Sequence, residues 1–217
     1  MSLIQDPKWL RTLSRHLGWL AIPNIAVIFL TLQAIGFFFV LLDPVWVERF
    51  ALIPGLALSG EPWRLITFLA LPLSNSLIGI IFALWFLYFI LNLIENEWGA
   101  FKTTFYILVS LACTLTFSFV FSYPIFSVQD LVSSLFLAAA ALFPDFEVRV
   151  YLAIPVKLKF LGWLALGFVG LRFLQGSWLD RLLLVTIYSN YLIFFGPSLL
   201  YRVKEWKRKR DFRARSR

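Results

Sequence analysis

Six long apolar stretches constrain this chain more than any other feature of its sequence. They cover residues 22–42, 76–94, 103–121, 125–143, 158–174 and 182–201. A helix needs about 20 predominantly apolar residues to cross the hydrocarbon core of a bilayer. Hydrophobic residues make up 60% of the chain and charged residues 15%, whereas soluble domains average about 45–50% apolar and about 25% charged. The sequence therefore predicts an all-α polytopic membrane protein whose single membrane domain, residues 22–201, has six transmembrane helices.

Three segments outside these stretches have their own character. Residues 1–21 place basic side chains on one side and apolar ones on the other, which predicts an amphipathic helix at the cytoplasmic membrane surface. Residues 43–75 are too apolar for a solvated loop and are interrupted by prolines, which predicts an interfacial or partly re-entrant loop. Residues 202–217 carry nine Lys and Arg directly after an apolar stretch. That placement favours a cytoplasmic tail beside anionic lipid over a nucleic-acid-binding tail.

The distribution of basic residues predicts the orientation. If both termini are cytoplasmic, that side holds seven Lys and Arg from the N-terminal segment and two connections, and nine from the tail, which is 16 of the 20 in the chain. Cytoplasmic connections of membrane proteins are enriched in these residues. We therefore expect both termini in the cytoplasm. With no cleavable signal peptide recognised, the expected location is a bacterial inner membrane, and the endoplasmic reticulum stays open as an alternative.

Several landmarks follow one another in an order that a known superfamily shares. They are the Trp63-Arg64 pair within residues 60–67, residues 83–87, Glu95 and Gly99 at the end of the second apolar stretch, and residues 142–145 and 154–157. The first looks like the Trp-Arg motif that rhomboid proteases and derlins carry after their first helix. The next two resemble the second rhomboid helix, and the last two resemble the link between helices four and five. The chain thus resembles the rhomboid-like superfamily over about residues 60–160, which implies a six-helix rhomboid-like bundle.

The catalytic residues of that superfamily have no counterpart here. Its proteases use a serine in a Gly-x-Ser-Gly motif on helix four, a histidine on helix six and an oxyanion-binding asparagine on helix two. The chain contains no Gly-x-Ser-Gly motif, its one histidine is His16 before the first span, and the helix-two position falls on Ile80. A serine hydroxyl without a base in reach is a poor nucleophile. The resemblance therefore implies a catalytically inactive pseudoprotease, as derlins are, and not an enzyme.

Polar residues occupy the positions where the catalytic groups would lie. Gln129 and Asp130 fall near the serine's place, and Ser189 and Asn190 fall near that of the histidine. An ionisable residue inside a span costs about 2.5 kcal/mol or more near the bilayer centre, which makes Asp130 a candidate functional residue. We predict that the four residues share a polar cavity. It serves either as a functional site or as a structural hydrogen-bonding cluster between helices.

The remaining candidate residues lie in the loop of residues 43–75, called the first connection below, and at the end of the second span. Trp63 and Arg64 either shape the bilayer locally or anchor the loop, with Trp63 at the interface and Arg64 bonded to loop carbonyls. Glu95, followed by Gly99, is expected to hold loop backbone amides at the cytoplasmic end of its helix. The sequence shows no metal-ligand cluster, phosphate-binding loop or dinucleotide fingerprint, so we expect neither a metal nor another cofactor.

These observations favour a non-proteolytic protein that binds transmembrane segments of other membrane proteins, in quality control or trafficking. Its expected partners are the bilayer and such segments, without nucleic acid, and the expected client contact lies near Phe86 and Phe168. One alternative is an intramembrane serine protease with an unusual dyad, Ser134 with Asp130. The other is a small transporter or channel, which the lack of paired mid-membrane charges disfavours.

Overall fold

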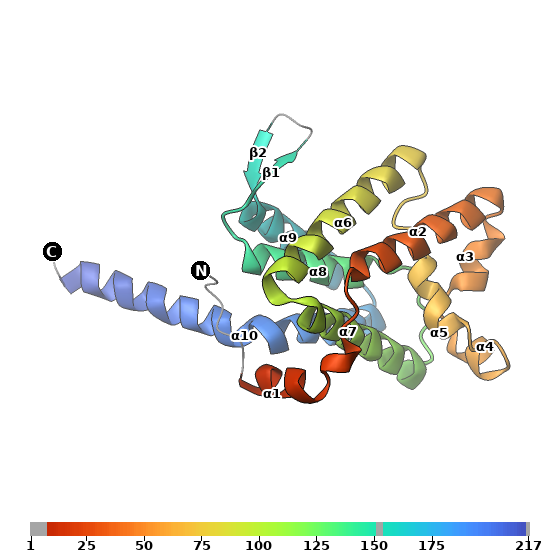
Figure 1. Ribbon diagram of the computed structural model, residues 1–217, viewed down its shortest axis with the longest axis horizontal. Coiled ribbons are helices and arrows are strands. Elements are labelled where there is room, and N and C mark those ends of the chain that lie inside the picture. The colour runs from red at the N-terminus through yellow and green to blue at the C-terminus, as the bar shows by residue number, and fades with distance from the viewer. Residues whose placement is uncertain (1–7, 151–153, 216–217) are drawn as a thin grey trace.

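The structure, a computed structural model, describes residues 8–150 and 154–215 of the chain, and these residues are predominantly helical (Figure 1). The N-terminal half contains α1 (Lys8–His16), η1 (Gly18–Leu20), α2 (Ile25–Leu42), α3 (Val45–Phe50), α4 (Pro54–Leu58), α5 (Arg64–Thr67), η2 (Phe68–Ala70) and α6 (Leu77–Trp98). The C-terminal half contains α7 (Ala100–Phe121), α8 (Gln129–Leu142), the strands β1 (Glu147–Val150) and β2 (Ile154–Lys157), α9 (Leu158–Gln175) and α10 (Trp178–Arg215). The strands form an antiparallel hairpin that the sequence did not predict.

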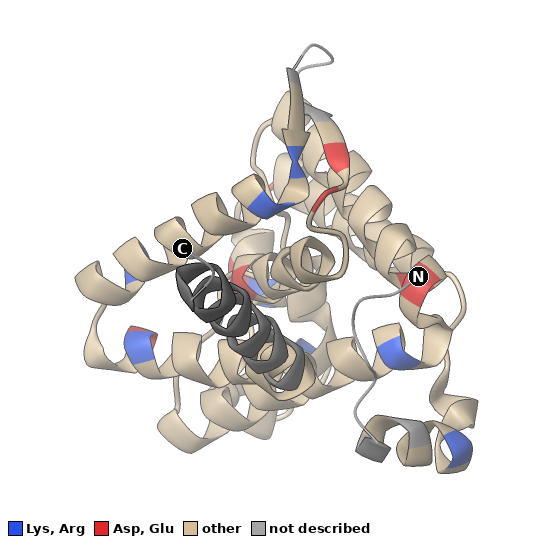
Figure 2. Ribbon diagram, turned by 90° about the vertical axis from the view of Figure 1, so that its left-hand side faces the viewer, with Lys and Arg blue, Asp and Glu red and all other residues tan. Residues whose placement is uncertain are grey.

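Five helical segments of the described part are long and apolar enough to cross a membrane. They are Gly18–Leu42, Leu77–Trp98, Ala100–Phe121, Leu158–Gln175 and Trp178–Gly196. Figure 2 shows long stretches of helix without a charged residue. The segments coincide with five of the six predicted spans, so the predominantly helical, multi-span character is confirmed. The predicted number of six transmembrane helices is not confirmed.

The sixth predicted span, residues 125–143, is helical only from Gln129. The 14 residues of α8 extend about 21 Å, because an α-helix rises 1.5 Å per residue, and the hydrocarbon core is about 30 Å thick. The beginning of the apolar stretch pairs with the first connection instead: Ile125 and Leu52 exchange both backbone hydrogen bonds, at 2.9 and 3.1 Å. This pairing satisfies the Ile125 backbone without a helix, which hydropathy does not reveal.

α8 lies at the centre of the bundle (Figure 1). It contacts α6, α7, α9 and α10. Its inward residues are fully buried, and the run of small side chains at residues 138–141 lets neighbouring helices approach closely. A helix enclosed by protein can be apolar without being long enough to span lipid. The position of α8 therefore explains both its composition and its length.

The first connection is attached to α2 by close backbone packing. Gln33 is fully buried; its side-chain amide donates to the carbonyls of Leu69 and Leu71, at 2.6 and 2.9 Å, and its Oε1 accepts the N–H of Leu73 at 3.1 Å. One turn further along, a Cβ added at Gly36 would lie 1.6 Å from the carbonyl oxygen of Ala70. The connection is thus an ordered segment of short helices against α2.

The two ends of the described chain are also helical. α1 directs Leu10, which is 1% exposed, towards the bundle near α7. α10 continues without a break to Arg215, past residue 201, where the sixth span was predicted to end. Its 38 residues extend about 57 Å, which exceeds the thickness of a hydrocarbon core of about 30 Å. The described part of the predicted tail, residues 202–217, is therefore a helical extension of the last span.

Candidate functional site

A groove of about 700 Å³ opens between α9 and α10, with α8 as its floor. α8 contributes Ala140 and Ala141, α9 contributes Gly162 and Gly170, and α10 contributes Tyr188 among other side chains. The lining is predominantly apolar. Because its two walls are candidate membrane spans, the groove faces the surroundings that lipid tails or another transmembrane helix occupy in a bilayer.

Close packing of α9 against α8 is limited to the first part of α9. The buried residues of α9 are Leu158 and Gly162, both in this part. A Cβ at Gly162 would lie 2.8 Å from the Cβ of Ala140, so glycine permits the close approach of α9 to α8 there. Further along, a Cβ at Gly170 would meet no atom within 4 Å. The groove between α9 and α10 opens beside this second glycine.

One polar atom in the groove is not satisfied. The Tyr188 hydroxyl is buried and has no partner with good hydrogen-bonding geometry, although Ser133 lies near it. The neighbouring Ser189 hydroxyl is satisfied, because it donates to the carbonyl of Thr186 at 2.7 Å. A buried polar group without a partner costs about 1–3 kcal/mol. Because this hydroxyl is enclosed by protein, a ligand in the groove reaches it only when the side chains around it move aside.

Charged and polar groups connect three helices at the far end of the groove. Arg172 of α9 forms an ion pair with Asp130 at the start of α8. Tyr123, in the connection before α8, donates to Asp180 of α10 at 2.5 Å. This hydrogen bond and, second, burial raise the pKa of Tyr123 to about 12. Asp180 also accepts the Ser177 N–H at 2.9 Å.

The structure does not bring the four predicted cavity residues together. Gln129 is exposed, Asp130 pairs with Arg172, and Ser189 lines the groove. Asn190 is fully buried on another face of α10, where it donates to the carbonyl of Tyr106 in α7 at 3.0 Å. Asn190 is therefore directed towards α7, whereas Ser189 lines the groove, and the two side chains do not share a cavity.

Sequence reasoning missed Arg172 as the partner of Asp130. A signal was present, because charged residues within membrane segments pair with one another. Asp130 lies near the start of the predicted span 125–143 and Arg172 near the end of the predicted span 158–174, and these two ends face the same side of the membrane because successive spans run in opposite directions. Matching charges between spans by their distance from the span ends would have found the pair.

The surroundings of Ser134 differ from those of an activated nucleophile. Ser134 is fully buried, and its hydroxyl donates to the carbonyl of Leu131 at 2.8 Å. Its own carbonyl accepts the Tyr106 hydroxyl at 3.2 Å. The carboxylate of Asp130 is occupied by Arg172. The described residues hold no group of three or more His, Cys, Asp or Glu side chains that could bind a metal ion.

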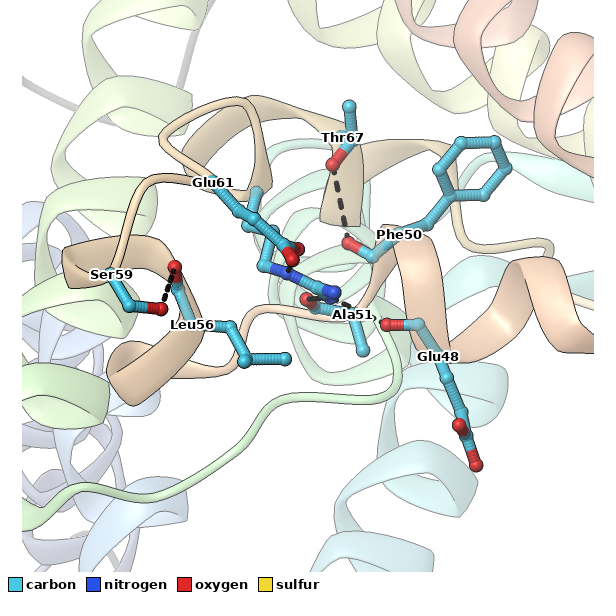
Figure 3. Close-up of polar contacts among 8 residues, drawn as sticks. Glu48, Phe50, Ala51, Leu56, Ser59, Glu61 and Thr67 are labelled. Atoms are coloured by element: carbon cyan, nitrogen blue, oxygen red, sulfur yellow. Dashed lines mark hydrogen bonds and ion pairs between the residues drawn. The ribbon is translucent and has the colours of Figure 1, made fainter.

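Arg64 is the central contact of the first connection, and its partners Glu48, Ala51 and Glu61 are labelled in Figure 3. It is 5% exposed, and its Nε lies 2.6 Å from Glu61. Its Nη1 donates to the carbonyls of Glu48 and Ala51, at 2.5 and 2.8 Å. Trp63, by contrast, is 53% exposed. Arg64 therefore bonds to loop carbonyls and holds α3 and α5 together, while Trp63 is free to lie at the interface.

Glu95 and Gly99 occupy the turn between α6 and α7. The Oε1 of Glu95 accepts the backbone N–H of Asn24 at 2.8 Å, so this carboxylate holds the loop that precedes α2. Its Oε2 is buried without a hydrogen-bond partner. Gly99 has a φ of +83°, a conformation that L side chains rarely adopt. The glycine allows the chain to reverse directly from α6 into α7.

The fold and the groove together define a polytopic α-helical membrane protein. The chain belongs to the family described as eukaryotic integral membrane protein (DUF1751), whose family model matches residues 23–196. This match covers the spans and the whole groove. Neither a search of curated proteins nor a search of solved structures gives a match.

Family membership corrects one prediction. The expected bacterial inner membrane is wrong, because the family consists of eukaryotic integral membrane proteins. The error has a physical reason: basic residues favour the cytoplasmic side in bacterial and eukaryotic membranes alike, so their distribution indicates sidedness and not the source. The family description does not mention rhomboids, and the resemblance to them stays a prediction.

Proposed function

We propose that this protein is a non-proteolytic rhomboid-like membrane protein that binds the transmembrane segments of other membrane proteins during their quality control or trafficking. The observation that carries this proposal is the groove of about 700 Å³ between α9 and α10. Its occupant in this proposal is one transmembrane helix with a polar side chain opposite Tyr188. Such a helix is unstable in lipid alone, since its polar group has no partner there.

Two features of the groove favour a helix over a lipid tail. Small residues on its wall and floor, Gly170 and Ala141, allow another backbone to approach closely, and close approach at small residues drives helix association in membranes. The Tyr188 hydroxyl offers a hydrogen bond, which an acyl chain cannot accept or return.

The proposed absence of proteolysis is supported by the surroundings of Ser134. Its hydroxyl is bonded to a backbone carbonyl within α8, and Asp130 is engaged by Arg172. Covalent labelling of the purified protein with a fluorophosphonate tests this part of the proposal. We expect no labelling. Labelling that disappears in Ser134→Ala would establish the protease alternative instead.

The groove is tested with two synthetic single-span peptides in proteoliposomes. Both are Leu-Ala helices, and one carries a central Asn. A photo-crosslinking residue at position 185, where Val185 lines the groove and is 55% exposed, should capture the Asn peptide several times more efficiently than the other. The Tyr188→Phe variant should remove this preference. The same probe at position 168, outside the groove on α9, serves as the control position.

Gly170 and Gly167 provide a matched pair of variants. A Cβ at either position meets no atom within 4 Å, so a side chain can leave the backbone at both without a clash at its first atom. Gly170 lines the groove and Gly167 does not. Gly170→Leu should therefore abolish capture from position 185, whereas Gly167→Leu should not. Equal capture in both variants, or recovery of lipid alone, would contradict the proposal.

A further inference from the structure

A second pocket, of about 410 Å³, lies within the first connection and is separate from the groove. It is lined by Trp46, Arg49, Phe50, Glu61, Trp63, Arg64 and Thr67. Three aromatic rings, two guanidinium groups and one carboxylate thus surround one small volume. Such a lining is suited to a ligand that carries both charge and apolar surface.

The pocket lies at a membrane face. The connection begins where α2 ends, at Leu42, and ends where α6 begins, at Leu77, and these two helices pack side by side. Apolar side chains of the connection remain exposed: Leu58 is 78% exposed and Ile66 63% exposed. Exposed apolar and tryptophan side chains beside the ends of spans are typical of the headgroup region. The pocket therefore opens among lipid headgroups.

The two arginines of the pocket differ in burial and in bonding partners. Arg64 is buried and already bonded to Glu61 and to two carbonyls, so its charge is compensated. Arg49 is exposed, and its guanidinium lies over the Trp46 ring, 4.9 Å from the centroid. Among the described residues, Arg49 has no carboxylate within ion-pair distance. Stacking orients this guanidinium and leaves its N–H groups available for an anion.

We infer that this pocket binds the headgroup of a phosphatidylcholine molecule. The phosphate is held by Arg49, because a guanidinium matches phosphate oxygens with paired, charge-assisted hydrogen bonds. The trimethylammonium group lies against the exposed Trp63 ring, since quaternary ammonium groups bind to aromatic faces. The carboxylate of Glu61 is already paired with Arg64, so the trimethylammonium is recognised by the aromatic ring and not by a free negative charge. A headgroup without a quaternary ammonium lacks this second contact.

Native mass spectrometry of the full-length protein in detergent tests this inference with defined added lipids. Phosphatidylcholine should be retained about ten times more strongly than phosphatidylglycerol. Phosphatidylethanolamine should lie between them, because its primary ammonium gains less from the Trp63 ring than a trimethylammonium group does. Free phosphocholine should compete with the retained lipid, whereas inorganic phosphate should not. Competition by both alike would indicate a plain anion site and overturn the assignment.

Amino-acid substitutions distinguish lipid binding in the pocket from non-specific lipid binding elsewhere on the protein. Arg49→Ala should weaken retention of phosphatidylcholine about tenfold, and Trp63→Ala several-fold, with partial recovery in Trp63→Phe. Arg181→Ala is the matched control, because Arg181 also lies over an aromatic ring, that of Phe173 at 5.9 Å, but outside the pocket. If Arg49→Ala also lowers the melting temperature, the Arg49→Lys variant provides the test instead. Lysine keeps the positive charge but lacks the planar guanidinium group, so this variant should still weaken retention of phosphatidylcholine. Retention unaffected by both Arg49 variants would refute the inference.

Discussion

Replacing Gly36 by alanine should destabilise the protein, although alanine is the better helix former. A Cβ at this position would lie 1.6 Å from the carbonyl oxygen of Ala70, whereas real Cβ contacts essentially never fall below 3.0 Å. The contact is with backbone, which cannot rotate away as a side-chain end can. The η2 turn must therefore move away from α2.

The structure sets the size of the effect. The required shift is the difference between 3.0 and 1.6 Å, about 1.4 Å. Gln33 lies one turn earlier on α2 and bonds to the segment around Ala70 at 2.6, 2.9 and 3.1 Å. A shift of this size stretches all three bonds past hydrogen-bonding range. Losing them costs about 3 kcal/mol, and the helix gains about 0.5–1 kcal/mol from the replacement of glycine, so the net loss is about 2 kcal/mol.

Thermal unfolding in detergent measures this loss through Cys113. It is the one cysteine of the chain and is partly buried, so a thiol-reactive fluorophore reports its exposure on unfolding. For a chain of this length, a loss of about 2 kcal/mol corresponds to a decrease in Tm of roughly 4–8 °C. Gly167→Ala is the control, because a Cβ there meets no atom within 4 Å. It should leave Tm unchanged or raise it slightly.

A second measurement tests the route of the effect. If Gly36→Ala acts by breaking the hydrogen bonds of Gln33, it should cost much less in a Gln33→Leu background. Additive effects of the two substitutions would show that the bonds of Gln33 are not involved. A Gly36→Ala variant as stable as Gly167→Ala would refute the reasoning from the close contact itself.

Three further predictions concern polar contacts. Arg64→Ala should lower the free energy of unfolding by about 3–5 kcal/mol in the Cys113 assay, because it leaves two carbonyls and Glu61 unpaired; Arg64→Lys should cost less. A double-mutant cycle of Asp130→Ala and Arg172→Ala should give a coupling of about 1 kcal/mol, limited by the 53% exposure of the arginine side chain. The pKa of Tyr123 is raised from 10.0 to about 12, so its contribution to stability is complete below pH 10 and is lost as pH rises to about 12. Tyr123→Phe should therefore flatten the dependence of Tm on pH over this window.

Expectations for single residues concern local contacts. One of the two interpretations of the Trp-Arg pair had Arg64 bonded to loop carbonyls, and in the structure it is bonded to two. The end of α6 at Trp98 and the reversal at Gly99 also lie within a few residues of the predicted end of the second span at residue 94. These features are local, because a cap, a turn glycine or a motif acts on its neighbours in the chain.

The candidate site was predicted less well. The sequence grouped Asp130 with Asn190, whereas the structure pairs Asp130 with Arg172 and Asn190 with the backbone of Tyr106. Partners 42 and 84 residues apart depend on how helices are rotated and tilted against one another. Hydropathy gives neither angle. The groove between α9 and α10 follows from the same angles and was likewise not predicted.

The amino-acid sequence by itself determined that this chain is an integral membrane protein, and it determined where the long helices lie. The transfer of an apolar stretch into lipid depends on the sum of its own residues, so it can be read without knowing the fold. Only the tertiary structure decided that Ile125 pairs with Leu52 of the first connection and that α8 is a short central helix. It also decided that a groove opens between α9 and α10. These outcomes depend on which surfaces meet, and close packing between distant segments is specified by three-dimensional fit rather than by local composition.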